Sequence, residues 1–417
     1  MKALKVILVI LILVLLAEVG FLVYDNFGKE LFAVHPTTEA TEAPTEEPTT
    51  ESISIELPPA VTVEPTEAPT EMTTVPVTEA PTTEAPTEVP TEVPTEAPTE
   101  APTEAPTEPE ETVPDAEVFV LSFAGNCVLG GPPSDNSSAS FVKVVGEDYG
   151  YPFRNVAEIF KKDEFTFLDL ECVLADSGTP AKSGYVFRGP TSYAKILTEG
   201  GVDAVSLANN HTNDFGKEGY DSTKSALEAE GIAYSEKDSY LLHTTPNGLK
   251  IGIYTVSVKF DRWSMQQAIN KMNKEGADLI VVYFHWGEAA AYAPNATQIK
   301  NAHSAIDNGA DIVIGTNSGL LQGVEYYKHG MICYSLGNFS YGGAKWPTDM
   351  DTVIVQQEII RDKFGNVTLG EGYFIPCSMT SAKSGNNFQP TPMEMDSWQY
   401  NSVLKKLTEP VWEVQKN

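Results

Sequence analysis

Short apolar runs recur along the chain from about residue 117, and segments with apolar residues at helical spacing separate them. Runs of this kind are typical of strands buried on both faces. The predicted strands are 117–124, 165–170, 204–207, 250–256, 279–284 and 312–315, and the predicted helices are 153–162, 192–199, 217–230, 262–275 and 296–308. Such alternation predicts an α/β layered domain.

The end of the chain has a different pattern. Apolar runs follow one another there with only turn sequences between them, such as Lys328-His329-Gly330. The predicted strands of this region are 323–327, 331–335, 352–359 and 367–374. Because strands joined by short turns form hairpins, we expect these to supply a mostly antiparallel second sheet.

The N-terminus carries one long apolar stretch. Lys2 and Lys5 precede the unbroken run Val6–Ala17, which continues past Glu18 as Val19–Tyr24. The first run has the length of a signal peptide core, whereas the whole stretch can cross a bilayer. No small-residue cleavage motif follows the run. Lys2 and Lys5 should keep the N-terminus on the inner side of the membrane. Glu18 fits less well, because a carboxylate within a membrane span costs free energy unless it lies near an end. We therefore expect residues 1–28 to be a single-pass anchor in the cell membrane, with the C-terminal domain extracellular.

Residues 29–114 are of low complexity, and Pro-Thr-Glu-Ala or Pro-Thr-Glu-Val repeats from Pro86 to Pro106. A proline at every fourth position excludes helix, the glutamates repel one another, and few large apolar groups are available for a core. We expect a disordered, extended stalk. The folded domain is then predicted to comprise residues 115–417.

The charge of the chain is strongly negative and unevenly distributed. The 417 residues carry a formal net charge of −31, and 19 of the 58 acidic residues lie between Glu39 and Glu111. The rest of the chain therefore has a charge of about −12. Nucleic-acid binding depends on clustered Lys and Arg, so this balance argues against a nucleic-acid partner.

Polar residues gather where the predicted strands end. Glu171 follows the strand 165–170, Asn209 to Asp214 follow the strand 204–207, and His285 follows the strand 279–284. Asn126 and Asn338 also come directly after apolar runs. Asn and Asp are common helix caps, and the segment Asn209–Asp214 taken alone fits that role. The whole set, however, has the carboxylate, amide and imidazole groups expected around a divalent metal or an anionic substrate.

Five ordered motifs show a family resemblance. They are Asp169-Leu170-Glu171, Tyr185-Val186-Phe187-Arg188-Gly189-Pro190, Ala208-Asn209-Asn210-His211 with Asp214 and Gly216, His285-Trp286-Gly287, and Tyr334-Ser335-Leu336-Gly337-Asn338-Phe339. With them, the chain from about Glu117 to its end resembles the CapA-type poly-γ-glutamate capsule-synthesis family. That family's domain looks like a calcineurin-type metallophosphatase. The resemblance implies an α/β/β/α two-sheet sandwich.

The resemblance also implies roles for single residues. Glu171, Asn210, His285 and Asn126 stand at the metal-ligand positions of the family. His211 stands at the acid/base position, and Asn210 and Asp214 complete the predicted catalytic group. Arg188, Asn209 and Asn338 are predicted to bind substrate. Because a guanidinium binds carboxylate or phosphate through two parallel hydrogen bonds, Arg188 is the cation expected to face an anionic ligand; a structural ion pair is the alternative.

Two of the family's motifs are altered here. Gly125-Asn126 stands where the family has Gly-Asp, so the carboxylate that would bridge two metals is an amide. Gly315-Thr316-Asn317-Ser318-Gly319 stands in place of Gly-x-His-Pro-His, so two histidines are missing. We therefore expect no two-metal centre and at most one divalent ion, Mn²⁺, Mg²⁺ or Ca²⁺. Catalytic activity is left open.

These features together predict a membrane-anchored extracellular protein of capsule or poly-γ-glutamate biosynthesis or attachment, with a degenerate metal site. The expected partners are the membrane, an anionic polymer such as poly-γ-glutamate, and a capsule synthase complex. Two alternatives stay open: a non-catalytic surface domain that binds an anionic polymer, and a single-metal hydrolase of cell-envelope substrates.

The four cysteines are Cys127, Cys172, Cys333 and Cys377. An even number in an exported protein permits disulfides, and Cys127 and Cys172 could pair if the strands that precede them are neighbours. Buried thiols are the equally good alternative in a domain of this size.

Overall fold

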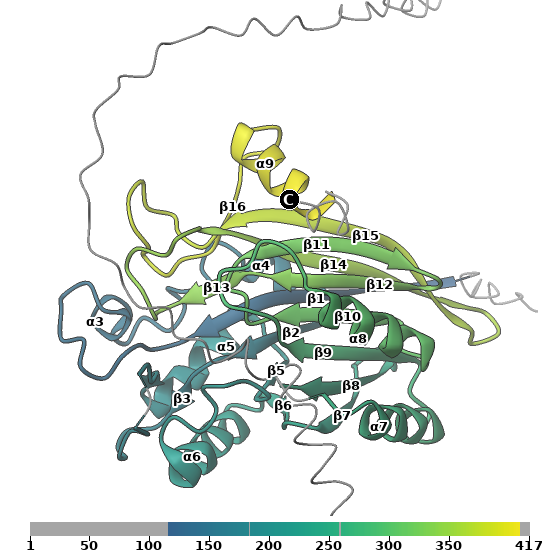
Figure 1. The fold of residues 1–417 in the computed structure, drawn as a ribbon, viewed down its shortest axis with the longest axis horizontal. Coiled ribbons are helices and arrows are strands. Elements are labelled where there is room, and N and C mark those ends of the chain that lie inside the picture. Colours follow the sequence, from purple (N-terminus) through teal and green to yellow (C-terminus); the bar gives the residue numbers. More distant parts are fainter. Residues whose placement is uncertain (1–115, 183, 258–259, 409–417) are drawn as a thin grey trace, which may run out of the picture. The chain divides into compact units, whose positions relative to one another are not determined.

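The computed structural model describes residues 116–182, 184–257 and 260–408, which form two β-sheets packed face to face with helices outside them (Figure 1). The predicted anchor and stalk lie outside the described residues. No helix among the described residues is long and apolar enough to cross a membrane.

The first sheet has the strand order β16-β15-β14-β1-β2-β5-β6, with β13 paired to the end of β1. β1, β2, β5 and β6 run parallel to one another, whereas β14 pairs with β1 in the antiparallel sense. Its strands are β1 (Ala116–Val128), β2 (Phe165–Leu170), β5 (Ala204–Ser206), β6 (Ala233–Ser235), β13 (Asn338–Tyr341), β14 (Asp351–Asp362), β15 (Val367–Ser378) and β16 (Thr391–Pro392).

The second sheet has the order β11-β12-β10-β9-β8-β7, and its four central strands are parallel. Its strands are β7 (Ser239–Thr244), β8 (Lys250–Val256), β9 (Leu279–His285), β10 (Ile312–Thr316), β11 (Leu321–Tyr327) and β12 (Gly330–Leu336). A separate pair of short strands is formed by β3 (Val173–Leu174) and β4 (Arg188–Gly189).

Helices cover the outer faces of the two sheets, with one exception. They are α3 (Phe141–Val145), α4 (Ala157–Phe160), α5 (Ala194–Gly200), α6 (Gly216–Ala229), α7 (Arg262–Lys274), α8 (Ala296–Asp307) and α9 (Trp398–Thr408), with a 3-10 turn at Thr191–Tyr193 before α5. Side chains from α3 to α6 pack on the first sheet, and side chains from α7 and α8 pack on the second. The exception is α9, which packs its buried residues Val403 and Leu407 into the cluster between the sheets.

Alternation along the strands explains the layers. Phe167 lies in the cluster between the two sheets, and its neighbour Leu168 lies in the cluster beneath α4 to α6. In the second sheet Val281 faces the middle cluster and Val282 faces α7 and α8. Because both faces of each strand are buried, the strands are apolar throughout instead of alternating apolar with polar residues. The predicted α/β/β/α sandwich is therefore confirmed.

The prediction of a mostly antiparallel second sheet is wrong. Both hairpins form as expected, but they go to different sheets: β11 and β12 join the second sheet, and β14 and β15 join the first. β12 also pairs in parallel with β10, so each sheet mixes parallel and antiparallel strands. A short turn makes two consecutive strands pair with each other, whereas the packing of the whole domain decides which sheet that pair joins.

Other elements differ from prediction in length or existence. The helix expected over 153–162 is α-helical only in α4, and turns form residues 151–156. The short strands β6, β7 and β13 and the helices α3 and α9 were not predicted. By contrast, β2 and β8 have the predicted bounds, and α6, α7 and α8 each lie within one residue of theirs.

Candidate functional site

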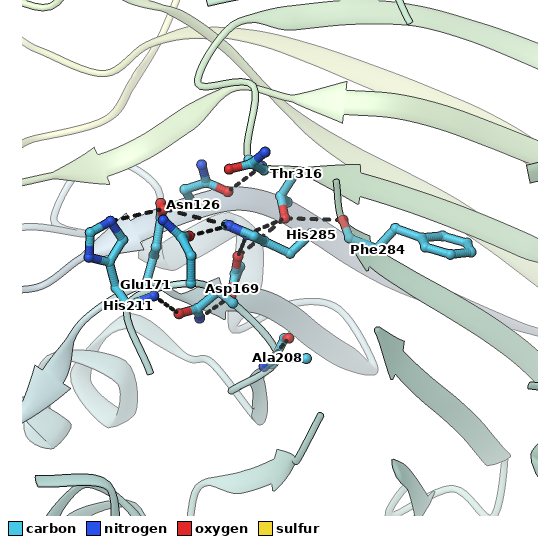
Figure 2. Close-up of polar contacts among 12 residues, drawn as sticks. Asn126, Asp169, Glu171, Ala208, His211, Phe284, His285 and Thr316 are labelled. Atoms are coloured by element: carbon cyan, nitrogen blue, oxygen red, sulfur yellow. Dashed lines mark hydrogen bonds and ion pairs between the residues drawn. The ribbon is translucent and has the colours of Figure 1, made fainter. Parts of the chain in front are cut away.

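The polar residues predicted at strand ends come together between the carboxyl ends of strands from both sheets (Figure 2). Asn126 of β1 is paired in register with Asp169 of β2 on one side and with Asn338 of β13 on the other. In the second sheet, His285 of β9 is paired with Thr316 of β10. Carboxyl ends of parallel strands meet at one edge of a sheet, and here two such edges face each other.

Asp169 lies at the centre of this site. Its side chain is fully buried, and its Oδ1 accepts a hydrogen bond of 2.8 Å from Asn209 Nδ2. Its Oδ2 lies 2.8 Å from His285 Nδ1 and 3.2 Å from Thr316 Oγ1. A buried carboxylate is tolerated only when it is paired and hydrogen-bonded, and Asp169 meets both conditions by joining the two sheets.

His285 is held through both ring nitrogens. Its Nδ1 faces Asp169, and its Nε2 lies 2.6 Å from the side-chain oxygen of Asn210. The contact with a carboxylate fixes the orientation of the ring, as is usual behind metal-binding histidines. Nε2 is consequently the nitrogen that points to Asn210 and into the site.

His211 and Asp214 form a second oriented pair. Asp214 Oδ2 lies 2.8 Å from His211 Nδ1 and also accepts a 2.7 Å hydrogen bond from the backbone N–H of Phe187. The His211 ring packs on the Phe187 ring with centroids 4.4 Å apart. With Nδ1 taken by the carboxylate, His211 turns Nε2 toward Glu171. This is the geometry in which a histidine can accept or donate a proton.

Glu171 lies between the two histidines. Its Oε1 is 3.9 Å from His211 Nε2 and 3.8 Å from His285 Nε2, distances too long for hydrogen bonds (Figure 2). Burial, followed by the charges of Asp169 and Asp214, raises the pKa of the Glu171 carboxyl well above its usual range. Desolvation and like charges both disfavour the ionised form, so the carboxyl favours its protonated state here unless a cation enters.

Asn209 is occupied by protein partners. Its Nδ2 donates to Asp169 and to the backbone oxygen of Leu170, and its Oδ1 accepts from the backbone N–H of His211 and from Thr212 Oγ1. The amide thus ties the loop after β5 to β2. Substrate binding by Asn209 stays a prediction, but these four contacts leave the amide little capacity for a ligand.

Three amides stand where the family resemblance places metal ligands or substrate contacts. Asn126 Nδ2 donates to Asn338 Oδ1 at 3.1 Å, and Asn126 Oδ1 accepts from the backbone N–H of Asn317 at 3.2 Å. Asn317, at a φ of +86°, donates from Nδ2 to the backbone oxygens of Trp286 and Gly287. These amides satisfy one another and their surroundings without a cation.

The described residues contain no group of three or more His, Cys, Asp or Glu side chains arranged to hold a metal ion. The residues that fit one ion best are Glu171, His285 and the amide oxygen of Asn210, a hard set that suits Mg²⁺, Mn²⁺ or Ca²⁺. Asn126 faces Asn317 and Asn338 and is the weakest of the four predicted ligands. Metal binding therefore stays a prediction.

Arg188 does not join the histidines. It begins β4, next to Phe187, and its guanidinium lies over the Phe215 ring at 4.9 Å from the ring centre. Hydrogen bonds from Thr191, and then the charge of Arg188, lower the pKa of the Asp176 carboxyl, so the alternative of a structural ion pair stays open. Arg188 lines a separate cavity with Lys143 and Asp176.

Asp169 and Thr316 are the residues that sequence reasoning missed as members of the site. Asp169 was noticed only as part of a motif, although a lone carboxylate inside the apolar run Phe165–Leu170 is itself a signal, because burying it requires a partner. Thr316 carries no comparable signal. Its position is set by pairing with His285 across β9 and β10.

All four cysteines are buried, free thiols. β1 and β2 are indeed neighbours, but Cys127 is paired in register with Leu170, and Cys172 lies two residues farther along, beyond the end of β2. The proposed pairing of Cys127 and Cys172 is therefore not formed. Burial raises the pKa of each thiol above its usual range, which makes these groups unreactive packing residues.

Comparison with known proteins identifies similar chains. A family model described as bacterial capsule synthesis protein PGA_cap matches residues 120–342. The capsule biosynthesis protein CapA of Bacillus anthracis is 29% identical over 249 residues, which cover 52% of this chain and 60% of that protein. The PGA biosynthesis protein CapA of Bacillus subtilis (strain 168) is 25% identical over 319 residues, which cover 70% of this chain and 78% of that protein.

Among solved structures, the NAD nucleotidase of Haemophilus influenzae aligns with a TM-score of 0.36 at 13% identity. The alignment covers 70% of this chain and 62% of that chain. Similarity at this level says nothing about the chemistry of the present site.

Proposed function

The chain belongs to the PGA_cap family of bacterial capsule synthesis proteins, and from this we propose that it acts in the synthesis or surface attachment of a poly-γ-glutamate capsule. Support comes from the names of the two CapA relatives, from the acidic stalk and from the apolar N-terminal stretch. We place the chain at the cell membrane with its folded part outside, next to a capsule synthase complex.

The observation that carries the chemical part of the proposal is the pair formed by His211 and Asp214. Asp214 orients His211 so that Nε2 faces Glu171. We propose that His211 moves the proton of the attacking or leaving group in hydrolysis or transfer of the polymer. Asp214 holds the ring in the required tautomer, as the third member of a catalytic triad does.

A single divalent cation would be held by Glu171, His285 and Asn210, and when bound it would polarise the reacting carbonyl or phosphoryl oxygen. It would also favour the ionised form of Glu171, which burial otherwise disfavours. Asp169 would support such a cation indirectly, by orienting His285.

A second candidate function is polymer binding without catalysis. The contacts among Asn126, Asn317 and Asn338 favour it, because these amides are hydrogen-bonded where a two-metal enzyme needs charged ligands. Metal content separates the candidates: the catalytic form requires a cation bound in proportion to protein, whereas the binding form does not.

Deletion of the gene, followed by measurement of surface poly-γ-glutamate, tests the proposed role. We expect a change in the amount, chain length or attachment of the polymer, which the wild-type gene should restore. Unchanged polymer in all three respects would refute the role. Complementation with a His211→Asn variant then decides between the two functions, because only the catalytic one needs Nε2.

A further inference from the structure

A cavity of about 310 Å³ lies beside β4, and the site described above does not include it. Adjacent residues of a strand point to opposite sides, and β4 and the residue before it show this. Phe187 packs on His211, whereas Arg188 lines the cavity. The cavity has the volume of a small-molecule site at the lower end of the usual range of roughly 300–1,000 Å³.

Close backbone packing forms one wall of this cavity. A Cβ atom on Gly189 would lie 2.1 Å from the backbone oxygen of Leu129, and one on Gly342 would lie 1.7 Å from that of Gly130. Only glycine permits such approaches, so three separate segments meet here without side chains between them. Gly131 also pairs with Arg188 through two backbone hydrogen bonds. The backbone that carries Arg188 is therefore firmly held.

Two cationic side chains line the cavity, Arg188 and Lys143. The guanidinium of Arg188 rests on the Phe215 ring, a contact that orients the group without neutralising it. Lys143 of α3 lines the same cavity and is exposed. Neither side chain donates a hydrogen bond to any residue that the structure describes, although the charge of Arg188 acts on the nearby Asp176 carboxylate.

The acidic groups of the cavity are bonded within their own loops. Asp176 accepts hydrogen bonds from the backbone N–H and the hydroxyl of Thr191, at 3.0 and 2.8 Å. Asp135 accepts one from the backbone N–H of Ser137 at 3.0 Å. The formal charges of the two acids and the two cations cancel. The acids accept hydrogen bonds from Thr191 and Ser137, whereas the cations donate none to a described residue. The unused hydrogen-bonding capacity of the cavity therefore belongs to the cations, although the charge of Arg188 also acts on Asp176.

Ser140 adds a hydroxyl to the same wall. The residue is 7% exposed, it lines the cavity, and its Oγ has no hydrogen-bond partner. An unpartnered buried hydroxyl is uncommon and costs free energy unless a ligand or water completes it. Pro132 and Pro133 provide apolar surface beside these polar groups.

We infer that this cavity is a carboxylate-binding site, in which Arg188 and Lys143 hold the free carboxylate of one glutamyl unit of a polymer chain. The inference rests on the proposed function for the identity of the polymer. Guanidinium matches the two oxygens of a carboxylate, the ammonium adds charge, and the prolines accommodate the methylene groups of the chain. The site thus binds polymer on the other side of β4 from the His211 pair and positions the chain without reacting with it.

Calorimetric titration of the full-length protein with two probes tests the inference. The probes are the dipeptide γ-glutamyl-glutamate and poly-γ-glutamate itself, with inorganic phosphate as a third titrant. The variants are Arg188→Ala, Arg188→Lys and Lys143→Ala. Arg262→Ala is the matched control, because Arg262 is an exposed arginine at the start of α7, beside a different cavity. Thermal unfolding of each variant shows that it is folded.

We expect Arg188→Ala to weaken binding of both probes by about tenfold or more, the loss typical of a charged hydrogen bond. Arg188→Lys should fall between wild type and Arg188→Ala, since it keeps the charge and loses the paired geometry. Lys143→Ala should have a smaller effect because the side chain is exposed. Arg262→Ala should bind as wild type does, and His211→Asn should retain dipeptide binding.

The outcomes separate this inference from the proposed function. If folded Arg188→Ala binds the polymer within about twofold of wild type, the cavity is not the site, although the capsule role survives. If the dipeptide binds through Arg188 and the polymer does not bind, the cavity inference stands and the polymer proposal fails. If phosphate binds through Arg188 and the dipeptide does not, the ligand of the cavity is a phosphate and the carboxylate inference fails. If none of the three titrants binds, the cavity is not a binding site.

Discussion

The carboxylate of Asp169 lies 2.8 Å from Nδ1 of His285, and both side chains are completely buried. The two residues belong to different sheets, so this contact joins the carboxyl ends of β2 and β9. It also orients the imidazole that faces Asn210. One contact therefore serves both the packing of the sheets and the arrangement of the site.

Replacement of Asp169 should destabilise the fold. Asp169→Ala leaves His285 Nδ1 buried without its partner and removes one of the two acceptors of Asn209 Nδ2, which should lower the free energy of unfolding by about 3–5 kcal/mol. Urea unfolding followed by circular dichroism measures this change. Asp221→Asn is the control, because Asp221 is about half exposed on α6 and should change the stability by under about 0.5 kcal/mol. A loss below about 1 kcal/mol for Asp169→Ala would show that the pair does not hold the sheets together.

His211→Asn should abolish capsule function while leaving the fold intact. The asparagine amide can still donate to Asp214, but it has no counterpart of Nε2. His211→Ala is less suitable, since the histidine side chain is only 12% exposed and its loss should cost about 1–3 kcal/mol of stability. Polymer amount and attachment in the complemented deletion strain are the readout.

His303→Asn is the control for that experiment. His303 lies on α8, where its Nε2 contacts Glu325 at 2.9 Å, away from the site. We expect normal polymer with this variant. Full complementation by His211→Asn would show that His211 takes part in no proton transfer that capsule formation requires.

Asn126→Asp should raise the affinity for a divalent cation. One oxygen of the new carboxylate would still accept the hydrogen bond from the backbone N–H of Asn317. The other oxygen would replace the Asn126 Nδ2 donor and would face Asn338 Oδ1, which it repels. A cation relieves that repulsion, and an added charged ligand should tighten Mn²⁺ binding by about tenfold or more.

Elemental analysis and Mn²⁺ titration test this expectation. Wild type should bind no more than one ion per chain, and Asn126→Ala should show no gain. Two tightly held transition metals in wild-type protein would contradict a degenerate centre. Restoring a histidine at Gly319 is a poorer test, because Gly319 has a φ of +73°, which strains any other residue.

The free energy of unfolding should fall as the pH rises, because of Asp163. Burial raises the pKa of its carboxyl to about 7, and its Oδ1 has no hydrogen-bond partner. The folded state therefore holds a proton that the unfolded state releases near pH 4. The protein should lose stability progressively between about pH 4 and pH 7, by up to roughly 4 kcal/mol for a shift of about three pKa units.

Asp163→Asn cannot ionise and should flatten that part of the pH profile. The comparison to make is the difference in unfolding free energy between pH 5 and pH 8, in wild type and in the variant. An equal decline in both proteins would show that Asp163 is not the group responsible.

Sequence reasoning succeeded where apolar runs are continuous. β2 and β8 have their predicted bounds because every residue or nearly every residue of them is buried, so the apolar pattern and the strand coincide. β7 was missed for the opposite reason. Its residues Ser239–Thr244 are half-buried or exposed at the edge of the sheet, and its apolar run is only Tyr240–Leu242, too short to stand out as a strand.

The candidate site was predicted in its composition but not in its contacts. Strand ends identified Glu171, His211 and His285, because polar residues after a buried run are visible in sequence. Arg188 was expected to face an anionic ligand, and its position relative to the histidines was not predicted. The structure places it on the other side of β4, and a strand of two residues leaves no periodic pattern from which to infer the direction of a side chain.

The pairing of β1 with β14 has a consequence for how the protein is made. These strands lie side by side in the first sheet, and Glu117 and Arg361 form an ion pair across them although they are 244 residues apart in the sequence. Contacts between such distant segments slow folding, because a very long loop must close before they can form. Until residues of β14 have been synthesised, β1 remains a long apolar edge open to other chains. A chain released before that point would expose the edge permanently, so cells should depend on chaperones or on prompt completion of synthesis to prevent aggregation.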